Sequence, residues 1–491
     1  MKLYDILNCS AKSLIENGID PNKNLEPTRD ENCGADSILF YLTPVNEKNR
    51  KEEIYINTSA YAIVSDNQTK IKTTAKQIKV DNAREAYAFA LSRYYDINYK
   101  KMKIIGVTGT NGKTTTATLI YKILCFGEKK AGFIGTGLIE ICGNQISDKF
   151  YSMTTPDPEV LYKALKDMQD EGCEYVVMEV SSHALELGKV SPIKFEIGLF
   201  TNLSPEHMDF HKNINEYFEA KLKLFKNCKK AIYNVDDKYG KIAKSLSPCR
   251  AIGLGVIEQD AVYATEIKVK DIDGSTYFYR HKNLIFKAVT NLPGCFNVYN
   301  SLMALCCAIE LGISPCIAKK GLSSIKNIDG RMEKYQTDIT VIIDYAHTPQ
   351  AFENALLSIN KDKITRQNTV CIFGCGGERD KTKRSEMGKI AALHSNLIYI
   401  TEDNSRSEDF YSIVSDIECG IPKSTHYKII KKREEAIFSA ILSAHTGDRI
   451  AILGKGREGY IIDNDGKREY SERAVVESAL LTRSRLKINE D

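Results

Sequence analysis

Several absences in the sequence exclude broad classes of protein. There is no apolar run of about 18 residues, so we expect no transmembrane helix. The N-terminus is already amphipathic, so we expect no signal peptide. The 14 cysteines include no Cys-x-x-Cys pair, which is typical of reduced thiols in a cytoplasmic protein. With 68 basic and 64 acidic residues, the net charge of +4 is too balanced for a dedicated nucleic-acid binder.

The length and composition fit a soluble protein of several domains. A chain of 491 residues is longer than one hydrophobic core supports and predicts about three domains. The composition, 43% hydrophobic and 27% charged, is ordinary for a globular protein. Hydrophobic patterning divides the chain into residues 1–100, 101–329 and 330–491, and predicts an α/β fold. No internal repeat or low-complexity linker is evident.

Candidate strands alternate with helices through all three parts. In the first part, strands are expected at 38–42 and 62–64, and a helix over 83–94. In the second, strands are expected at 104–107, 175–179 and 197–200, with a β-rich stretch over 262–290. Asp157 and Pro158 are typical of the N-cap and first turn of a helix that runs to Gln169. From residue 330, strands at 341–343, 369–373, 397–400 and 450–453 predict a doubly wound, Rossmann-like parallel sheet.

A glycine-rich segment between a strand and a helix is typical of a phosphate-binding loop. It reads Gly109-Thr110-Asn111-Gly112-Lys113-Thr114-Thr115, with the helix beginning near Lys113. Glycines let backbone N–H groups turn toward a polyphosphate at a helix N-terminus. Lys113 would reach the β- and γ-phosphates, and the hydroxyl of Thr114 or Thr115 would bind Mg²⁺. The spacing is unusual because Val107 stands where the first glycine is expected. We predict an ATP-binding site on the central sheet.

Two further strands end in groups that suit a magnesium site. Glu179 closes the strand at 175–179, and His207 and Asp209 follow the strand at 197–200. Ligands of open α/β sheets collect at the carboxyl ends of the strands, and carboxylates are favoured ligands of Mg²⁺. An acid at a strand end also serves as a helix cap. From the residues alone, both roles stay open for Glu179.

These segments resemble the Mur ligases, a family that forms amide bonds with ATP through an acyl phosphate. The shared motifs are Gly-Thr-Asn-Gly-Lys-Thr at 109–114, Glu-Val-Ser-Ser-His at 179–183 and Thr-Asn-Leu at 201–203. The resemblance implies that Glu179 and His207 bind Mg²⁺ together with the loop threonine. It also implies a set of residues that position a sugar-peptide acceptor, namely Thr154, Thr155, Ser181 and Lys189, the last of which replaces the family's arginine.

Lys221 lies beside an apolar helix face, and by itself it would be a surface lysine whose stem covers that face. The resemblance gives it another role. The pattern Ala220-Lys221-x-x-Leu224-Phe225 matches the family's lysine that is carbamylated to N6-carboxylysine and binds a second Mg²⁺. A carbamate suits that role because it replaces a cation with an oxygen anion. The implied catalytic residues are therefore Lys113, His207 and Lys221.

Further nucleotide contacts are expected after the β-rich stretch. Asn297 and Asn300 lie on one helix face, and they match the family pattern Gly-x-Phe-Asn-x-x-Asn, which lies near the ATP base. They also suit the polar start of a helix. Arg331 can neutralise phosphoryl charge, and Asp344 can accept ribose hydroxyls. Without the resemblance, Asp344 is equally well explained as a cap at a strand end.

Polar clusters follow three predicted strands of the C-terminal part, at 373–381, 402–406 and 454–458. They resemble the Mur ligases that add the third residue of the peptidoglycan stem peptide. In that subfamily, Asp-Asn-Pro-Arg marks addition of meso-diaminopimelate rather than lysine; here Ser405 replaces the proline. A bidentate arginine suits the distal carboxylate of diaminopimelate, and a carboxylate suits its ammonium group. The implied amino-acid site consists of Arg379, Asp403, Asn404, Arg406, Gly454 and Glu458.

The resemblance implies a cytoplasmic, monomeric enzyme that uses ATP and Mg²⁺ to join meso-diaminopimelate to UDP-N-acetylmuramoyl-L-alanyl-D-glutamate in peptidoglycan synthesis. One alternative is a family member that ligates L-lysine or uses another acceptor, because the family's uracil-binding signatures are not recognisable around 27–29 and Arg457 replaces a histidine. A folylpolyglutamate synthetase is disfavoured by the segments at 403–406 and 454–458. A non-enzymatic nucleotide-binding regulator is disfavoured because Lys113, Glu179 and His207 are all present.

Overall fold

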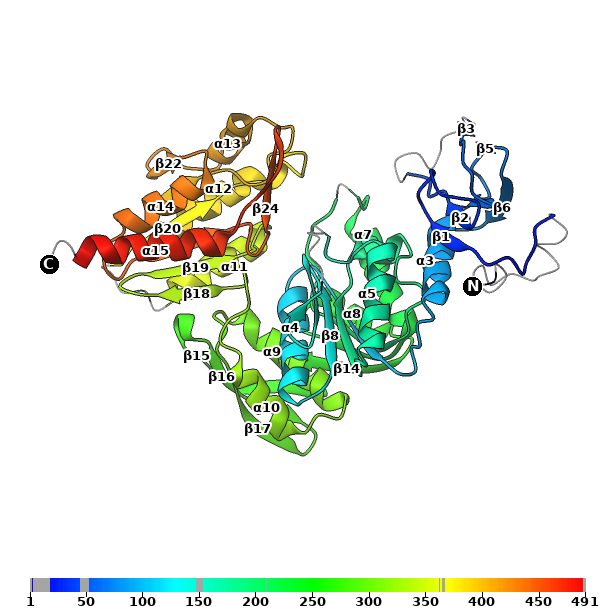
Figure 1. The fold of residues 1–491 in the computed structure, drawn as a ribbon. Helices are drawn as coiled ribbons and strands as arrows, with labels where there is room; N and C mark the ends of the chain where they lie inside the picture. The colour runs from blue at the N-terminus through cyan, green and yellow to red at the C-terminus, as the bar shows by residue number, and fades with distance from the viewer. Residues whose placement is uncertain are drawn as a thin grey trace.

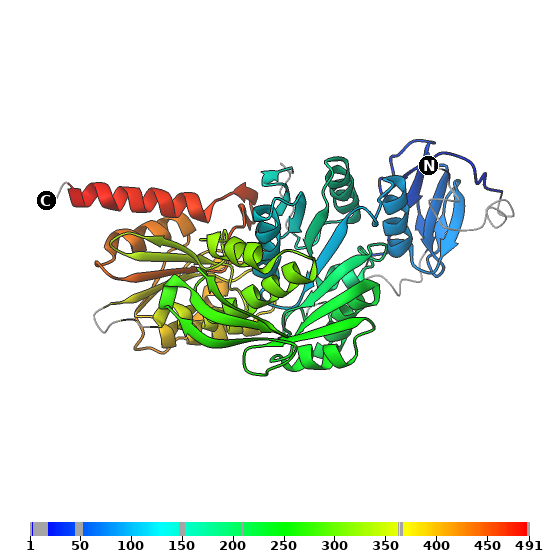
Figure 2. The ribbon, with the colours of Figure 1, turned by 90° about the horizontal axis from the view of Figure 1, so that it is seen from below.

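The computed structural model describes residue 2 and residues 18–44, 53–146, 153–208, 210–361, 363 and 367–488. Three α/β units lie in a row in the order of the chain (Figure 1, Figure 2). They contain a four-stranded, an eleven-stranded and a six-stranded sheet respectively, so the predicted fold class is confirmed. Across the described ranges, no helix combines the length and apolar character needed to cross a membrane.

The first unit pairs four short parallel strands in the order β1-β2-β4-β6, with helix α3 beside them. The predicted helix is confirmed, and it begins where the Asn82 side chain accepts the backbone N–H groups of Arg84 and Glu85. The predicted strand at 38–42 ends at Phe40. The elements are β1 (Glu26–Thr28), β2 (Ser37–Phe40), β3 (Ile54–Tyr55), β4 (Ala62–Asp66), β5 (Ile71–Lys72), β6 (Lys76–Val80) and α3 (Ala83–Tyr94).

The central sheet is parallel from β8 to β15 and antiparallel at both ends, in the order β10-β9-β8-β11-β7-β12-β13-β14-β15-β16-β17. Its strands are β7 (Lys103–Thr108), β8 (Ala131–Gly135), β9 (Leu138–Ile141), β10 (Asn144–Gln145), β11 (Tyr175–Glu179), β12 (Phe195–Phe200), β13 (Cys228–Asn234), β14 (Arg250–Gly255), β15 (Val262–Val269), β16 (Ser275–His281) and β17 (Leu284–Thr290). Its helices are α4 (Lys113–Phe126), α5 (Pro158–Asp170), α6 (Ser182–Glu186), α7 (Ile214–Leu222), α8 (Lys238–Ser245), α9 (Phe296–Glu310) and α10 (Pro315–Ser324), with the 3₁₀ helices η2 (Lys223–Asn227) and η3 (Asp271–Asp273).

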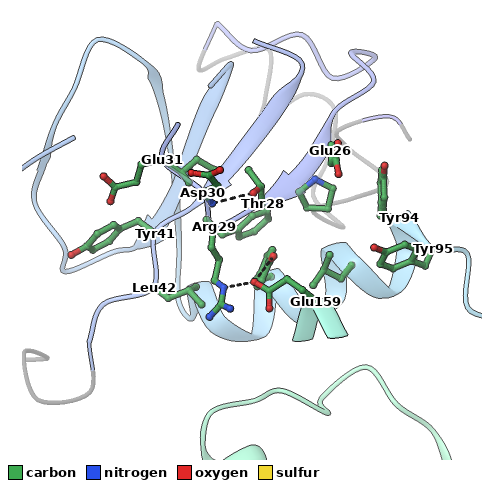
Figure 3. A pocket seen from close by; sticks show the side chains of 15 residues that line it. Glu26, Thr28, Arg29, Asp30, Glu31, Tyr41, Leu42, Tyr94, Tyr95 and Glu159 are labelled. Atoms are coloured by element: carbon green, nitrogen blue, oxygen red, sulfur yellow. Dashed lines mark hydrogen bonds and ion pairs between the residues drawn. The ribbon is translucent and has the colours of Figure 1, made fainter. Parts of the chain in front are cut away.

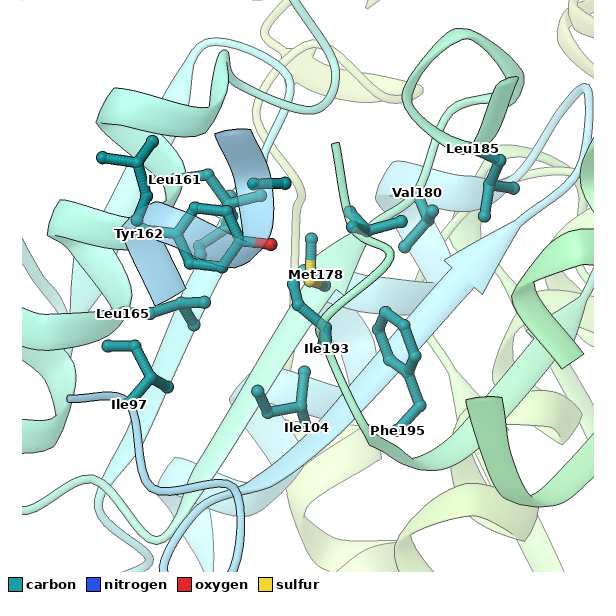
Figure 4. Packing of buried hydrophobic residues seen from close by; sticks show 14 of the residues in the cluster. Ile97, Ile104, Leu161, Tyr162, Leu165, Met178, Val180, Leu185, Ile193 and Phe195 are labelled. Atoms are coloured by element: carbon teal, nitrogen blue, oxygen red, sulfur yellow. The ribbon is translucent and has the colours of Figure 1, made fainter. Parts of the chain in front are cut away.

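Both faces of the central strands β7, β8, β11 and β12 are buried, which explains their unbroken apolar runs. Successive residues of β7 point to opposite faces: Ile104 belongs to one core cluster and Ile105 to the other. Figure 4 shows Leu161, Tyr162 and Leu165 of α5 directed at the first face. Helices α4 and α9 cover the second face. The carboxyl ends of β7, β11 and β12 are thereby fixed next to one another.

The third unit has the strand order β18-β19-β23-β20-β21-β22, parallel except for β18. The sequence order is interrupted because β23 lies between β19 and β20, so segments distant in sequence end at one edge. The strands are β18 (Glu333–Gln336), β19 (Thr340–Asp344), β20 (Thr369–Phe373), β21 (Leu397–Ile400), β22 (Tyr427–Ile429), β23 (Arg449–Leu453), β24 (Tyr460–Asp463) and β25 (Gly466–Glu469). The helices are α11 (Pro349–Asn360), α12 (Thr382–His394), α13 (Phe410–Glu418), α14 (Arg433–Ser443) and α15 (Glu472–Ile488).

A buried ion pair joins the two helices α14 and α15. The Arg433 side chain is fully buried, and its Nε and Nη2 donate to the Glu472 carboxylate at 2.9 and 2.7 Å. The same guanidinium also donates to the backbone oxygens of Glu402 and Leu453. All of these partners are needed because an unpaired buried charge costs several kcal/mol. The pair therefore anchors α15 against the strand ends of this sheet.

We expect Glu472→Ala to lower the free energy of unfolding of the C-terminal unit by about 3–5 kcal/mol, because it strands the Arg433 charge in the interior. The matched control is Glu434→Ala, which removes a half-exposed partner of Arg468 and should cost less than about 1 kcal/mol. Urea titration followed by circular dichroism measures both variants, since the chain contains no tryptophan. Equal stability losses in the two variants would contradict the anchoring role.

Candidate functional site

The segment predicted to bind phosphate forms a strand–loop–helix turn between β7 and α4. Gly109 and Gly112 have φ values of +144° and +82°, which disfavour any residue with a side chain. Space excludes one as well. A Cβ at Gly112 would lie 2.5 Å from Asn300 Oδ1, and one at Gly109 would lie 1.9 Å from Thr201 Oγ1. The Lys113 ammonium donates to the backbone oxygens of Gly109 and Thr110 at 3.0 and 2.7 Å, so the lysine folds over the loop.

Glu179 is completely buried beside this loop. Its carboxylate accepts the backbone N–H of Thr136 at 2.8 Å and the hydroxyl of Thr114 at 2.8 Å. The hydroxyl of Thr114 in turn accepts Arg331 Nη2 at 2.8 Å. The helix-cap alternative for Glu179 is wrong, because α6 is capped by Ser181, whose Oγ accepts the Ala184 N–H.

Lys221 stands at the end of α7 with only 1% of its surface exposed, so the surface-lysine alternative is also wrong. Its Nζ donates to the Gly109 backbone oxygen at 2.8 Å and lies 4.3 Å from the centre of the Tyr217 ring. Burial lowers the pKa of this amine well below its ordinary value, and repulsion by Lys113 lowers it further. The structure thus holds a buried amine of lowered pKa under the phosphate loop.

His207 adopts the left-handed region with φ +58°. Burial lowers its pKa to about 3 against the opposing charge of Glu206. Glu206 accepts His347 Nε2 at 2.9 Å, a contact from the central unit to the C-terminal unit. Burial alone would raise the pKa of Glu206, but the His347 hydrogen bond and nearby positive charges hold it well below its usual range. The sequence motif includes Glu206 and His207 as an acid–His pair, but no separate role was predicted for Glu206. Asp209 lies outside the described residues.

Glu179, Glu206, His207 and His347 line a cavity of about 320 Å³ between the central and C-terminal units. From the predicted nucleotide set it is lined by Thr110, Asn111, Gly112, Lys113, Thr114, Thr115, Asn300, Arg331 and Asp344. Gly109, Lys221 and Asn297 lie just outside that lining. Asn297 instead accepts Asn300 Nδ2 at 2.8 Å and so holds Asn300 in place. Asp344 accepts the N–H groups of Met332 and Ala346, as expected of a strand-end cap, and burial raises its pKa.

The predicted amino-acid residues gather at the neighbouring strand ends around a lysine that sequence reasoning missed. Lys455 is fully buried, and its Nζ lies 3.2 Å from Asp403 Oδ1, 3.1 Å from Asn404 Oδ1 and 3.2 Å from Glu458 Oε2. Asn404 Nδ2 also donates to Glu458 Oε2 at 2.9 Å. A lysine between two glycines at a strand end was the only signal in the sequence. Lys455 compensates two acids that would otherwise repel each other.

Arg406 and Arg379 flank the same cluster. Arg406 has φ +54°, and its Nη1 donates to the backbone oxygens of Gly377 and Asn404 at 2.6 and 3.2 Å. A Cβ at Gly376 would lie 3.4 Å from Arg406 Nη1 and 3.7 Å from Arg379 Cγ, so both arginines approach that glycine. The Arg406 guanidinium thus lies against the backbone of Asn404, and the stem of the Arg379 side chain passes Gly376.

Three of the predicted acceptor residues lie next to Glu179 and Thr136. Thr155 Oγ1 donates to the Glu179 backbone oxygen at 2.9 Å and accepts the Ser181 N–H at 3.0 Å. Thr154 Oγ1 accepts the Thr136 hydroxyl at 3.3 Å. Thr154 also lines the cavity beside the phosphate loop.

The prediction that Asp157 caps α5 holds for its position but not for its side chain. Asp157 does occupy the N-cap position, with Pro158 after it, but its side chain makes no capping hydrogen bond. Lys189 Nζ draws the carboxylate away at 2.7 Å, and Arg29 of the first unit approaches it to 3.6 Å. Charge attraction between neighbouring elements has overridden the local cap. Asp157 therefore joins the first unit to the central unit.

A second cavity of about 670 Å³ opens in the first unit around the segment 27–29, where the family's uracil signatures were not recognisable. Figure 3 shows Glu26, Thr28, Tyr94 and Tyr95 around it, and Arg29 reaching Glu159 of α5. Tyr87 donates to the same carboxylate at 3.0 Å. The cavity is thus a cleft of aromatic and acidic side chains, tied to the central unit by Arg29.

The donor set beside the phosphate loop fits Mg²⁺. Among the residues that the structure describes, no group of three or more His, Cys, Asp and Glu side chains would enclose a metal. Mg²⁺ commonly keeps several waters and binds through one or two carboxylates plus substrate phosphates. Glu179 and the Thr114 hydroxyl, side by side on the cavity wall, match that mode.

Comparisons with known proteins identify the family. The family profile described as "Mur ligase middle domain" matches residues 107–308, and "Mur ligase, glutamate ligase domain" matches residues 330–456. The chain is 37% identical to the UDP-N-acetylmuramoyl-L-alanyl-D-glutamate–2,6-diaminopimelate ligase of Syntrophomonas wolfei, over 87% of this chain and 88% of that protein. The chain belongs to the Mur ligase family.

The resemblance seen in the motifs is therefore confirmed over nearly the whole chain. This Mur ligase is 36% identical to the ligase of the same name from Clostridium tetani, over 97% of each protein. A solved structure titled as that ligase superimposes with a TM-score of 0.67 at 26% identity, covering 99% of both chains. Both matches extend through the first unit, where the motifs were weakest.

We expect Lys455→Ala to weaken amino-acid binding, because the two carboxylates it compensates would repel each other in a buried site. The loss should be about 2–5 kcal/mol, or about 30-fold or more in affinity. Calorimetric titration with meso-diaminopimelate measures the affinity, and ADP titration of the same sample is the internal control. Unchanged amino-acid affinity in a folded variant would exclude this role.

Proposed function

We propose that this Mur ligase joins meso-diaminopimelate to UDP-N-acetylmuramoyl-L-alanyl-D-glutamate, with ATP converted to ADP and phosphate. One observation supports the proposal above the others. Tyr345 lines the nucleotide cavity, and its hydroxyl lies 3.5 Å from Glu458 in the amino-acid cluster. The two sites therefore share a wall, as a reaction between a phosphorylated acceptor and an amine requires.

The reaction has two balanced steps. An oxygen of the acceptor's glutamate carboxylate attacks the γ-phosphorus, the bond to ADP breaks, and an acyl phosphate forms. The diaminopimelate nitrogen then attacks the acyl carbon, phosphate leaves, and the nitrogen loses a proton to give the amide. Mg²⁺, when bound, would supply charge neutralisation at the phosphates. Closure of the C-terminal unit on the central unit would protect the acyl phosphate from hydrolysis.

The residues of the nucleotide cavity have separate tasks in this scheme. The loop N–H groups and Lys113 hold the phosphates, and Arg331 stabilises the negative charge on the transferred phosphoryl group. Glu179, Thr114 and His207 would hold the metal. Lys221 would become a carbamate and supply an additional oxygen ligand. Its burial supports this, because a neutral amine is the form that adds to CO₂.

The acceptor would span the first and central units. Its nucleotide end suits the 670 Å³ cavity, where tyrosine rings can stack against a base. Its peptide end would pass Thr154, Thr155, Ser181 and Lys189 on the way to the phosphate loop. In this proposal residues 1–100 bind the nucleotide end, residues 101–329 bind ATP, and residues 330–491 bind the amino acid.

Diaminopimelate is favoured over lysine by the charges of the C-terminal cluster. Arg406 and Arg379 provide guanidinium groups for the distal carboxylate, while Asp403 and Glu458 provide acids for the ammonium. Lysine has no distal carboxylate and would leave an arginine facing an ammonium, which is repulsive.

We further propose that the enzyme acts in the cytoplasm as a monomer. All described cysteines are free thiols, which suits a reducing compartment.

The direct test is phosphate release by the purified protein with ATP, Mg²⁺, the acceptor and a panel of amino acids. We expect release only when the acceptor and meso-diaminopimelate are both present. Lys113→Ala should abolish it with little change in the melting temperature, since the hydrogen bonds of the Lys113 ammonium go to the backbone oxygens of Gly109 and Thr110 in its own loop. Substantial release by Lys113→Ala, or selective use of another acceptor, would contradict the proposal.

Lys221 should carry an added mass of about 44 Da at mild pH, the carbamate that gives the site another oxygen ligand. Intact-protein mass spectrometry or ¹³C NMR in labelled bicarbonate detects it. Lys221→Ala should be nearly inactive and partly rescued by short carboxylic acids that replace the missing anion. Lys223→Ala, whose ammonium pairs with Glu186 at the surface, is the matched control and should retain activity. Full activity of Lys221→Ala would remove the proposed role.

Arg406→Ala should lose about 30-fold or more in kcat/KM for diaminopimelate, because one charge-assisted pair to the distal carboxylate is removed. ATP binding should be retained, and discrimination against L-lysine should relax. Arg485→Ala, an exposed arginine on α15, controls for a general loss of positive charge. A wild-type preference for L-lysine would overturn the diaminopimelate assignment while leaving the ligase chemistry intact.

A further inference from the structure

Arg457 connects the amino-acid loop of the C-terminal unit to the central sheet. It follows β23 on the loop 454–458, and its Nε and Nη2 both donate to the backbone oxygen of Thr136, at 3.0 and 2.6 Å. Thr136 follows β8 of the central sheet. The two residues are 321 positions apart in the chain, so the contact exists only while the two units are docked.

Thr136 is also the residue that orients Glu179. Its backbone N–H donates to Glu179 Oε1 at 2.8 Å, and its hydroxyl lies 3.4 Å from Oε2. Glu179 Oε2 receives the Thr114 hydroxyl from the phosphate loop. One short chain of contacts therefore runs from Arg457 through Thr136 to Glu179 and Thr114. None of these steps passes through a flexible surface side chain.

The loop that bears Arg457 is held rigidly from behind. Gly330, at the junction of the two units, has φ +63°, and a Cβ there would lie 2.2 Å from the Arg457 backbone nitrogen. Gly456 packs equally closely on Tyr345, since a Cβ there would lie 2.8 Å from the Tyr345 Cβ. The neighbouring Lys455 is fixed in the amino-acid cluster. Because this loop is closely packed, the position of Arg457 sets the position of the Thr136 carbonyl that it binds.

We infer that Arg457 is a positioning residue that couples docking of the C-terminal unit to the nucleotide cavity. By fixing Thr136 it sets the orientation of the Glu179 carboxylate, and so raises the affinity of the cavity for Mg²⁺ with a bound nucleotide. The inference rests on the proposed function only in treating the cavity as a magnesium–nucleotide site. The paired donation requires a guanidinium, because a lysine ammonium presents no rigid fork of donors.

The experiment measures ADP binding by calorimetry across a series of Mg²⁺ concentrations, with neither acceptor nor amino acid present. We expect Arg457→Gln to need about five-fold or more Mg²⁺ for the same ADP affinity as wild type, and Arg457→Lys to be intermediate. Lys334→Ala is the matched control. Lys334 also joins the two units, because its Nζ pairs with Asp273 at 2.6 Å, but this pair does not belong to the contacts from Arg457 through Thr136 to Glu179. This variant should stay within about two-fold of wild type.

Three results would overturn the inference: an Arg457→Gln titration that superimposes on wild type, an equal shift in Lys334→Ala, or wild-type ADP binding that does not respond to Mg²⁺. Circular dichroism establishes that each variant is folded, and if Arg457→Gln is not, the shift in Arg457→Lys decides. Because no ligation is involved, failure of the proposed function shows separately, as a wild type that responds to Mg²⁺ but releases no phosphate with diaminopimelate.

Discussion

Burial of the Glu179 carboxylate is the constraint on which the functional region depends. A buried carboxylate is costly unless donors surround it, and here the donors come from separate segments: Thr136 after β8 and Thr114 at the start of α4. Arg331 reaches Thr114 from the C-terminal side of the cavity, and Arg457 reaches Thr136. Satisfying one charge thus draws the phosphate loop, a neighbouring strand end and the third unit into one arrangement.

The positive charges beside this carboxylate follow a related logic. Lys113 and Lys221 both donate to the Gly109 backbone oxygen. Burial lowers the pKa of each amine, and repulsion by Lys113 lowers the pKa of Lys221 further. A protein that bound no anion here would gain nothing from placing two lysines on one carbonyl. The arrangement suits polyphosphate binding at Lys113, which relieves the repulsion, and conversion of Lys221 into an anion, which removes it. Function and local strain therefore have the same physical origin.

Charged contacts join the three units in addition to apolar packing, because one core cluster runs from the first unit into the central unit and Ile272 of the central unit belongs to the core of the third. Arg29 pairs with Glu159 between the first two units, and His347 with Glu206 between the last two. Such contacts are weaker than apolar packing and break when units separate. The buried pair Arg433–Glu472, in contrast, lies within one unit.

The sequence by itself determined the fold class, most strands of the parallel sheets, and the phosphate loop, because apolar runs and glycine spacing are local signals. It also placed Asp403, Asn404 and Glu458 at strand ends of one sheet. Tertiary structure alone decided the rest. The Asp157 side chain pairs with Lys189 instead of capping the first turn of α5. Lys221 is buried rather than exposed, and Lys455 pairs with the acids of the amino-acid cluster. Each of these depends on charges brought together from distant segments, and such contacts cannot be predicted from a pattern within a short window of sequence.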